Sequence, residues 1–192
     1  GSLLVAAAVP LILGAPLPVT ATYILSAALI APALIKIKID VVAAHMFLLY
    51  WATLASVTPP TCTGCVIAAN ISGGNWLRSS FVGMKLGIVA FLVPFFFVVN
   101  PALIGRGAPW DVTICAVTGL VGAIFMAGGF FGFMRSRLNP VFRVLYFGAG
   151  VLLLAPSGTL SLAGAGAAAL GLVLESLTMR KGGAGAAARS AD

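Results

Sequence analysis

Two short segments rich in glycine, proline and threonine hold the residues of this chain whose types and spacing could do chemistry. They span residues 14–20 (GAPLPVT) and residues 58–64 (TPPTCTG), and each interrupts a long apolar run. Proline lacks a backbone N–H and its ring collides with the preceding turn, so both segments should break a helix. Inside a membrane, paired breaks expose backbone carbonyls that bind a cation and helix N-termini that attract an anion. The pattern is typical of the binding site of a secondary transporter.

The candidate ion- and substrate-binding residues are the glycine, prolines and threonines of these two breaks. Threonine adds hydroxyl oxygens, and sodium is bound well by neutral oxygen ligands of this kind. Sodium as the coupling ion therefore fits the set without a carboxylate, and no other metal and no organic cofactor is expected. The alternative is that Pro59 and Pro60 only kink a membrane helix whose neighbours satisfy the freed backbone groups. The full candidate set is Gly14, Pro16, Pro18, Thr20, Thr58, Pro59, Pro60, Thr61 and Thr63.

A cysteine pair and a single histidine are the other reactive side chains in the apolar runs. Cys62 and Cys65 form a CxxC, a spacing shared by redox pairs and zinc sites. Zinc needs about four ligands, and only His45 and Cys115 remain, both distant in sequence. We expect the cysteines to be small packing residues and His45 to be a hydrogen-bonded structural residue, although an intramembrane ionisable residue merits a test as a proton relay. The sequence has no P-loop, no Ser/His/Asp set and no carboxylate pair, so an enzyme is not expected.

The composition places both breaks in a lipid bilayer. Hydrophobic residues make up 61% of the 192 residues and charged residues 8%, with a mean hydropathy of +1.14, whereas an ordinary soluble domain is about 25% charged. The polar residues are too few to cover a water-soluble globule. The sequence therefore predicts an all-α membrane protein, a polytopic helical bundle.

The chain has a net charge of +7, and the positions of its basic residues predict the membrane topology. The 11 Lys and Arg residues lie almost wholly in short connections between apolar runs, and cytoplasmic loops retain such residues. The arginines of residues 135–143 therefore predict a cytoplasmic boundary, which also places Arg78 on the cytoplasmic side. Lys36 and Lys38 then fall outside, a mild departure from the rule. Because the basic residues do not gather on one folded face, a nucleic-acid partner is not expected.

The apolar runs predict the elements that position the two breaks. Residues 3–13 are too few for a membrane span, so with residues 19–35 they should form a re-entrant hairpin around the first break. Residues 41–72 are too many for one straight span and too few for two, so we expect one crossing interrupted halfway. Further spans are expected at residues 81–99 and 112–134, followed by a hairpin of residues 144–155 and 160–175.

An ordered series of motifs accompanies these elements. It comprises GAPLPVTATY (14–23), APAL (31–34), AAHMF (43–47), TPP (58–60) and LVPFFFVVNPAL (92–103). The series resembles the C-terminal part of the large membrane subunit of tripartite ATP-independent periplasmic (TRAP) transporters, over about residues 3–105. The resemblance is closest to the form in which small and large subunits are fused.

The resemblance implies the second half of an inverted-repeat transporter, with residues 14–18 as the second hairpin tip and residues 58–61 as the second interruption. It implies a multi-pass permease of the bacterial inner membrane that takes up small organic anions, carboxylates by default, together with sodium. The implied partners are a periplasmic substrate-binding protein and the remaining transporter helices, that is, the first repeat and the scaffold, fused or in a separate small subunit. Since those parts are lacking here, we expect a fragment of a longer protein.

Three regions and two competing functions complete these expectations. Residues 1–105 should be the C-terminal part of the transport unit, residues 106–178 additional membrane helices, and residues 179–192 a disordered tail rich in small residues. One competing function is a non-transporting membrane scaffold or assembly subunit, in which both breaks are simple kinks. The other is an intramembrane enzyme that uses Cys62, Cys65 or His45.

Overall fold

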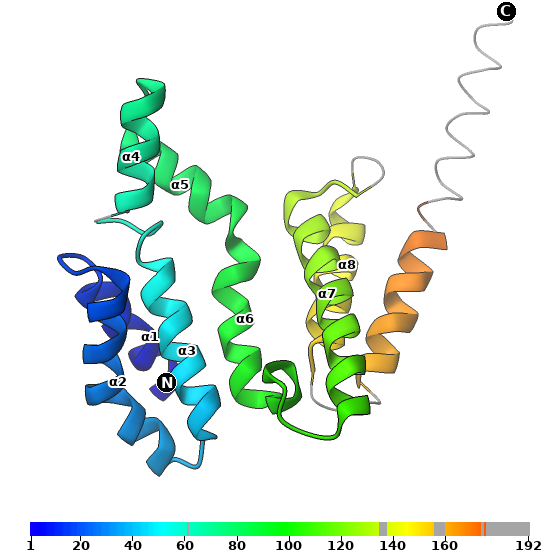
Figure 1. The fold of residues 1–192 in the computed structure, drawn as a ribbon. Coiled ribbons are helices and arrows are strands. Elements are labelled where there is room, and N and C mark those ends of the chain that lie inside the picture. Colours follow the sequence, from blue (N-terminus) through cyan, green and yellow to red (C-terminus); the bar gives the residue numbers. More distant parts are fainter. Residues whose placement is uncertain (61, 135–137, 156–159, 174, 176–192) are drawn as a thin grey trace, which may run out of the picture. The chain divides into compact units, whose positions relative to one another are not determined.

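The computed structural model describes residues 1–60, 62–134, 138–155, 160–173 and 175 (Figure 1). In these ranges the ordered segments are helices joined by short turns, so the predicted all-α fold class is confirmed. The chain divides into two compact units, residues 1–112 and 113–192. The assignment of residues 106–178 as additional membrane helices stays a prediction, and the predicted tail lies outside the described residues.

The first unit opens with the predicted hairpin. Helix α1 (Ser2–Leu13) has 12 residues, too few to cross a bilayer, whereas α2 (Val19–Lys36) has 18 and is long and apolar enough to do so. Between them the chain turns at residues 14–18, where Pro18 stands immediately before the first residue of α2. Proline at this position costs no hydrogen bond, because the first N–H groups of a helix have no partner within it.

The predicted interruption within residues 41–72 is also present. Helix α3 (Val41–Leu54) and helix α4 (Thr63–Ser72) are separated by residues 55–62, which include a cis peptide bond between Pro59 and Pro60. The Asp40 side chain caps the N-terminus of α3, since its Oδ1 accepts hydrogen bonds from the N–H groups of Val42 and Ala43 at 2.9 and 3.1 Å.

The following span differs from its prediction. A single helix was expected at residues 81–99, but the structure has α5 (Trp76–Leu86) and α6 (Ile88–Val99), bent by 49°. Helix α5 begins early because Asn75 caps it: its Oδ1 accepts hydrogen bonds from the N–H groups of Leu77 and Arg78. The bend falls at Gly87, a residue type at which helices commonly kink. A 3₁₀ helix, η1 (Pro101–Ile104), follows.

Helix α3 is the central element of the first unit and packs against α1, α2 and α6 (Figure 1). Its buried residues include Phe47, Leu48 and Trp51. The Phe47 ring meets Phe95 of α6 edge-on, with 5.5 Å between ring centroids, and Trp51 meets the same ring at 5.8 Å. Aromatic pairs at this spacing add directional packing to apolar burial. Helix α3 therefore fixes where the second break lies relative to the hairpin.

The second unit contains most of α7 (Pro109–Phe131), then α8 (Pro140–Leu153) and the helix Leu160–Val173. These elements match the predicted span and hairpin. Helices α7 and α8 approach each other closely at glycines. A Cβ added at Gly150 of α8 would lie only 2.6 Å from the carbonyl oxygen of Gly122 of α7, so a larger residue would not fit there. Arg143 donates hydrogen bonds to two carbonyls at the end of α7. Arg135 and Arg137 lie outside the described residues.

Candidate functional site

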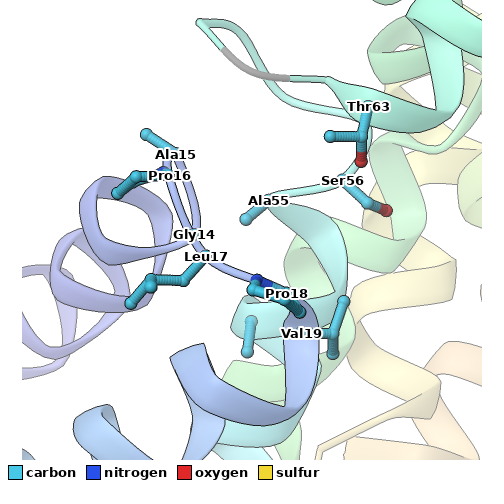
Figure 2. A pocket seen from close by; sticks show the side chains of 10 residues that line it. Gly14, Ala15, Pro16, Leu17, Pro18, Val19, Ala55, Ser56 and Thr63 are labelled. Carbon is cyan, nitrogen blue, oxygen red and sulfur yellow. The ribbon is translucent and has the colours of Figure 1, made fainter.

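The two helix breaks of the first unit line one cavity (Figure 2). Its volume is about 380 Å³. One wall is the hairpin turn between α1 and α2, and the other is the end of α3 with the first residue of α4. The prediction that the two breaks lie close together is confirmed. The lining residues are Gly14, Ala15, Pro16, Leu17, Pro18, Val19, Ala52, Ala55, Ser56 and Thr63.

The hairpin turn touches the end of α3 at Gly14. A Cβ added at Gly14 would overlap the Cβ of Ala55 and would lie 2.9 Å from the carbonyl oxygen of Pro10. Gly14 itself has ordinary right-handed helical angles, φ −69° and ψ −10°. Glycine is therefore required here for space and not for an unusual backbone conformation, and it brings the two breaks into contact.

A buried hydroxyl stabilises the end of the hairpin turn that leads into α2. Thr22 of α2 is completely buried and its Oγ1 donates to the carbonyl oxygen of Leu17 at 3.4 Å. Its N–H donates to the carbonyl oxygen of Pro18 at 2.9 Å. Thr22 was not among the predicted site residues. The available signal was its place one turn into the helix, within reach of the carbonyls of the preceding turn.

The second break is held by bonds that span it. The N–H of Gly64 in α4 donates to the carbonyl oxygen of Ser56 at 3.2 Å. The carbonyl oxygen of Val57 accepts a 2.7 Å hydrogen bond from the buried hydroxyl of Ser80 on α5. Because an unpaired backbone carbonyl is costly inside a bilayer, these bonds stabilise the interruption. Sequence reasoning missed both Ser56, which lines the cavity, and Ser80, which lies 23 residues beyond its acceptor.

The cavity brings together only part of the predicted residue set. Thr20 is exposed on α2 and is not in the lining, while the Thr58 hydroxyl donates at 2.8 Å to the carbonyl oxygen of Leu54, the last residue of α3. Pro59 and Pro60 also lie outside the lining. Thr61 lies outside the described residues. The predicted residues that line the cavity are Gly14, Pro16, Pro18 and Thr63.

The ends of four helices meet at this cavity. Helices α1 and α3 end beside it and present C-terminal backbone, whereas α2 and α4 begin beside it with Val19 and Thr63. Helix C-termini carry partial negative charge on free carbonyls, and N-termini carry partial positive charge on free N–H groups. None of the described lining residues is charged. The side-chain hydroxyls come from Ser56 and Thr63, so the polar character is that of neutral oxygens and helix ends.

The cysteines and the histidine have local partners. Cys62 is buried, and the Sγ of Cys65 lies 3.9 Å from the carbonyl oxygen of Val57. The Nδ1 of His45 lies 3.0 Å from the Tyr23 hydroxyl, in the hydrogen bond expected of a structural histidine. Over the part of the chain that the structure describes, no three His, Cys, Asp or Glu side chains gather as a metal site would require.

Comparison with known families gives a match over residues 1–108, to the family described as "Tripartite ATP-independent periplasmic transporter, DctM component". These residues include both breaks, the cavity and every helix from α1 to η1. No curated protein and no solved structure matches the chain.

Proposed function

Because this chain belongs to the DctM component family of tripartite ATP-independent periplasmic transporters, we propose that it is permease machinery for sodium-coupled uptake of small organic anions. Membership makes it a transporter membrane component, and the family is not one of enzymes. Sodium as the coupling ion and small organic anions as the substrate class are the parts that we propose. They rest on the cavity between the two breaks.

The observation that carries the proposal is the meeting of four helix ends around an uncharged cavity. The C-terminal ends of α1 and α3, beside Gly14 and Ala55, supply backbone oxygen in a site without carboxylates. Such oxygens, with the hydroxyls of Ser56 and Thr63, suit a monovalent cation. The N-termini of α2 and α4 carry partial positive charge and favour an anion. A cation and a carboxylate can therefore be bound side by side, which is what coupled uptake requires.

The remaining parts of the proposal follow from the family. We place the protein in the bacterial inner membrane as a multi-pass component. A periplasmic substrate-binding protein delivers the anion, and the first repeat and scaffold helices, fused or in a small subunit, complete the transporter. Substrate identity then depends on the binding protein and on the first repeat as well as on this cavity.

Uptake by the complete transporter in proteoliposomes, supplied with its binding protein, tests the coupling ion. Thr63→Val removes a hydroxyl of the cavity lining at nearly constant volume, and losing one ligand should raise the sodium concentration for half-maximal uptake about five- to hundredfold. Thr58→Val and Thr61→Val test the other predicted hydroxyls. Thr53→Val is the matched control, because the exposed Thr53 bonds its own helix at 2.9 Å and does not line the cavity.

The same assay distinguishes proton coupling and a scaffold role. His45→Gln should leave the sodium dependence unchanged. Unchanged sodium dependence in all three threonine variants, with uptake lost only in His45→Gln, would overturn the sodium assignment and leave a proton-driven carrier. Absence of any uptake by the complete, correctly inserted wild-type complex would favour the non-transporting scaffold.

A further inference from the structure

Helix α5 has two chemically different faces. Its inner face carries Ser80 and Gly83, and the Ser80 hydroxyl bonds the Val57 carbonyl oxygen. A Cβ at Gly83 would lie 3.1 Å from a Val57 methyl group, so this face packs tightly on the second helix break. Residues three apart lie on one side of a helix. Helix α5 therefore supports the break that forms one wall of the cavity.

The outer face of α5 carries two cations separated by apolar side chains. Arg78 and Lys85 are seven residues apart, two helical turns, and both are exposed. Phe81 and Val82 lie between them and are 59% and 51% exposed. Together with neighbouring residues of α5 these four line a shallow groove of about 590 Å³. Within the described residues, neither cation lies within ion-pair distance of a carboxylate.

The lengths of α5 and α6, the two helices that meet at the 49° bend, place α5 at a boundary of the bilayer. Helix α6 has 12 residues and is about 18 Å long, well short of the ~30 Å hydrocarbon core. Taken together as one broken span, the two helices reach across the bilayer, with α5 bent by 49° from α6 and covering the remaining depth. Trp76 at its start is 41% exposed, and tryptophan is enriched at membrane–water boundaries. Arg78 and Lys85 can extend to the phosphate level while Phe81 and Val82 face acyl chains.

We propose that this outer face of α5 is a binding site for an anionic phospholipid. The phosphate and the acidic headgroup lie between Arg78 and Lys85, and the first methylenes of an acyl chain contact Phe81 and Val82. Charge complementarity selects this occupant over a zwitterionic lipid, whose own cation opposes the two basic side chains. The predicted cytoplasmic position of Arg78 agrees, because anionic lipid is recognised there by basic clusters. The site is independent of the coupling ion.

The proposal is tested by titrating the purified chain in detergent with phosphatidylglycerol or with phosphatidylcholine of the same acyl chains, counting bound lipid by native mass spectrometry. The wild type should bind phosphatidylglycerol more tightly. Arg78→Gln with Lys85→Gln should weaken phosphatidylglycerol binding about tenfold and leave phosphatidylcholine binding unchanged. Arg78→Lys should keep most of the affinity. Circular dichroism checks that each variant retains its helices.

The matched control is Lys36→Gln with Lys38→Gln, which removes the same charge from two exposed side chains at the end of α2 and just beyond it. It should bind phosphatidylglycerol like the wild type. Equal loss in both double variants would mean that only net charge matters and would overturn the site. So would equal wild-type affinity for the two lipids. The titration is then repeated on the assembled transporter, where absence of any effect of Arg78→Gln with Lys85→Gln would mean that protein covers this face.

Discussion

The contact between the hairpin turn and the second break leads to a prediction about Gly14→Ala. The added methyl group would overlap the Cβ of Ala55 and would lie 2.9 Å from the Pro10 carbonyl oxygen. One of these neighbours is a methyl group and the other is a backbone atom, so no side-chain rotation can relieve the overlap. The backbone of the turn must therefore move away from α3.

The expected magnitude combines two opposing terms. Overpacking of this kind costs about 1–3 kcal/mol. The backbone at Gly14 is in the right-handed helical region, with φ −69° and ψ −10°, so alanine is conformationally allowed. The entropic gain from replacing glycine at an allowed position is about 0.4–1 kcal/mol. The difference of the two terms is a net loss of about 0–2.6 kcal/mol, with a central value of about 1.3 kcal/mol. That central value corresponds to a fall of about 3–5 °C in Tm for a chain of this size.

Thermal unfolding of the purified chain in detergent measures this loss, and another glycine provides the control. A Cβ at Gly148 in α8 would meet nothing within 4 Å. Gly148→Ala should therefore leave Tm unchanged or raise it, because alanine has the higher helix propensity. In the complete transporter, Gly14→Ala should also reduce uptake, since it displaces one wall of the cavity.

A double-mutant cycle isolates the contact itself. Ala55→Gly deletes the overlapping methyl group, so its combination with Gly14→Ala should be more stable than the sum of the single effects predicts, by about 0.5–2 kcal/mol. The recovery should be partial, because the Pro10 carbonyl oxygen stays close. Additive effects, or a Gly14→Ala variant as stable as Gly148→Ala, would refute the contact between the two breaks.

Two further predictions concern buried hydrogen bonds. Ser80→Ala removes the 2.7 Å bond to the Val57 carbonyl oxygen and should lower stability by about 1–3 kcal/mol, seen as a fall in Tm; an unchanged Tm would show that the break needs no support from α5. In the second unit, Tyr146→Phe removes the 2.8 Å bond to the buried Glu175 carboxylate and should cost about 1.5–3 kcal/mol. Tyr50→Phe, in α3, is its control and should cost less than half as much in the same melt.

The sequence predicted the interruptions well because their causes are local. The prolines of each break are clustered, Pro16 with Pro18 and Pro59 with Pro60, and such clusters interrupt a helix. A single proline does not suffice in this chain, since prolines also lie inside α1, α2 and α6, at Pro10, Pro32 and Pro94. The start of α5 was predicted late for a related reason. The apolar run begins at Phe81, but the cap supplied by Asn75 starts the helix before the run does.

Individual site residues were harder to predict, because the role of each depends on the direction in which its side chain points. Thr63 lines the cavity at the start of α4, yet Thr58, of the same type and five residues earlier, turns its hydroxyl back to the end of α3. Thr20 is exposed, whereas Thr22, two residues on, is buried. Residues two apart on a helix point about 200° apart, so composition and spacing cannot choose between them without the neighbouring helices.

The sequence by itself therefore determined a membrane protein, the order of most of its helices and the two proline-rich breaks, but not the bend at Gly87. Apolar composition and clustered prolines act over a few residues and need no partner elsewhere in the chain. Only the tertiary structure decided that the breaks share one cavity, that Gly14 meets Ala55, and that Ser80 supports the second break. Those contacts join residues tens of positions apart. They exist because α3 packs against the hairpin and against α6, and the helix rotations that this packing requires are properties of the assembled unit.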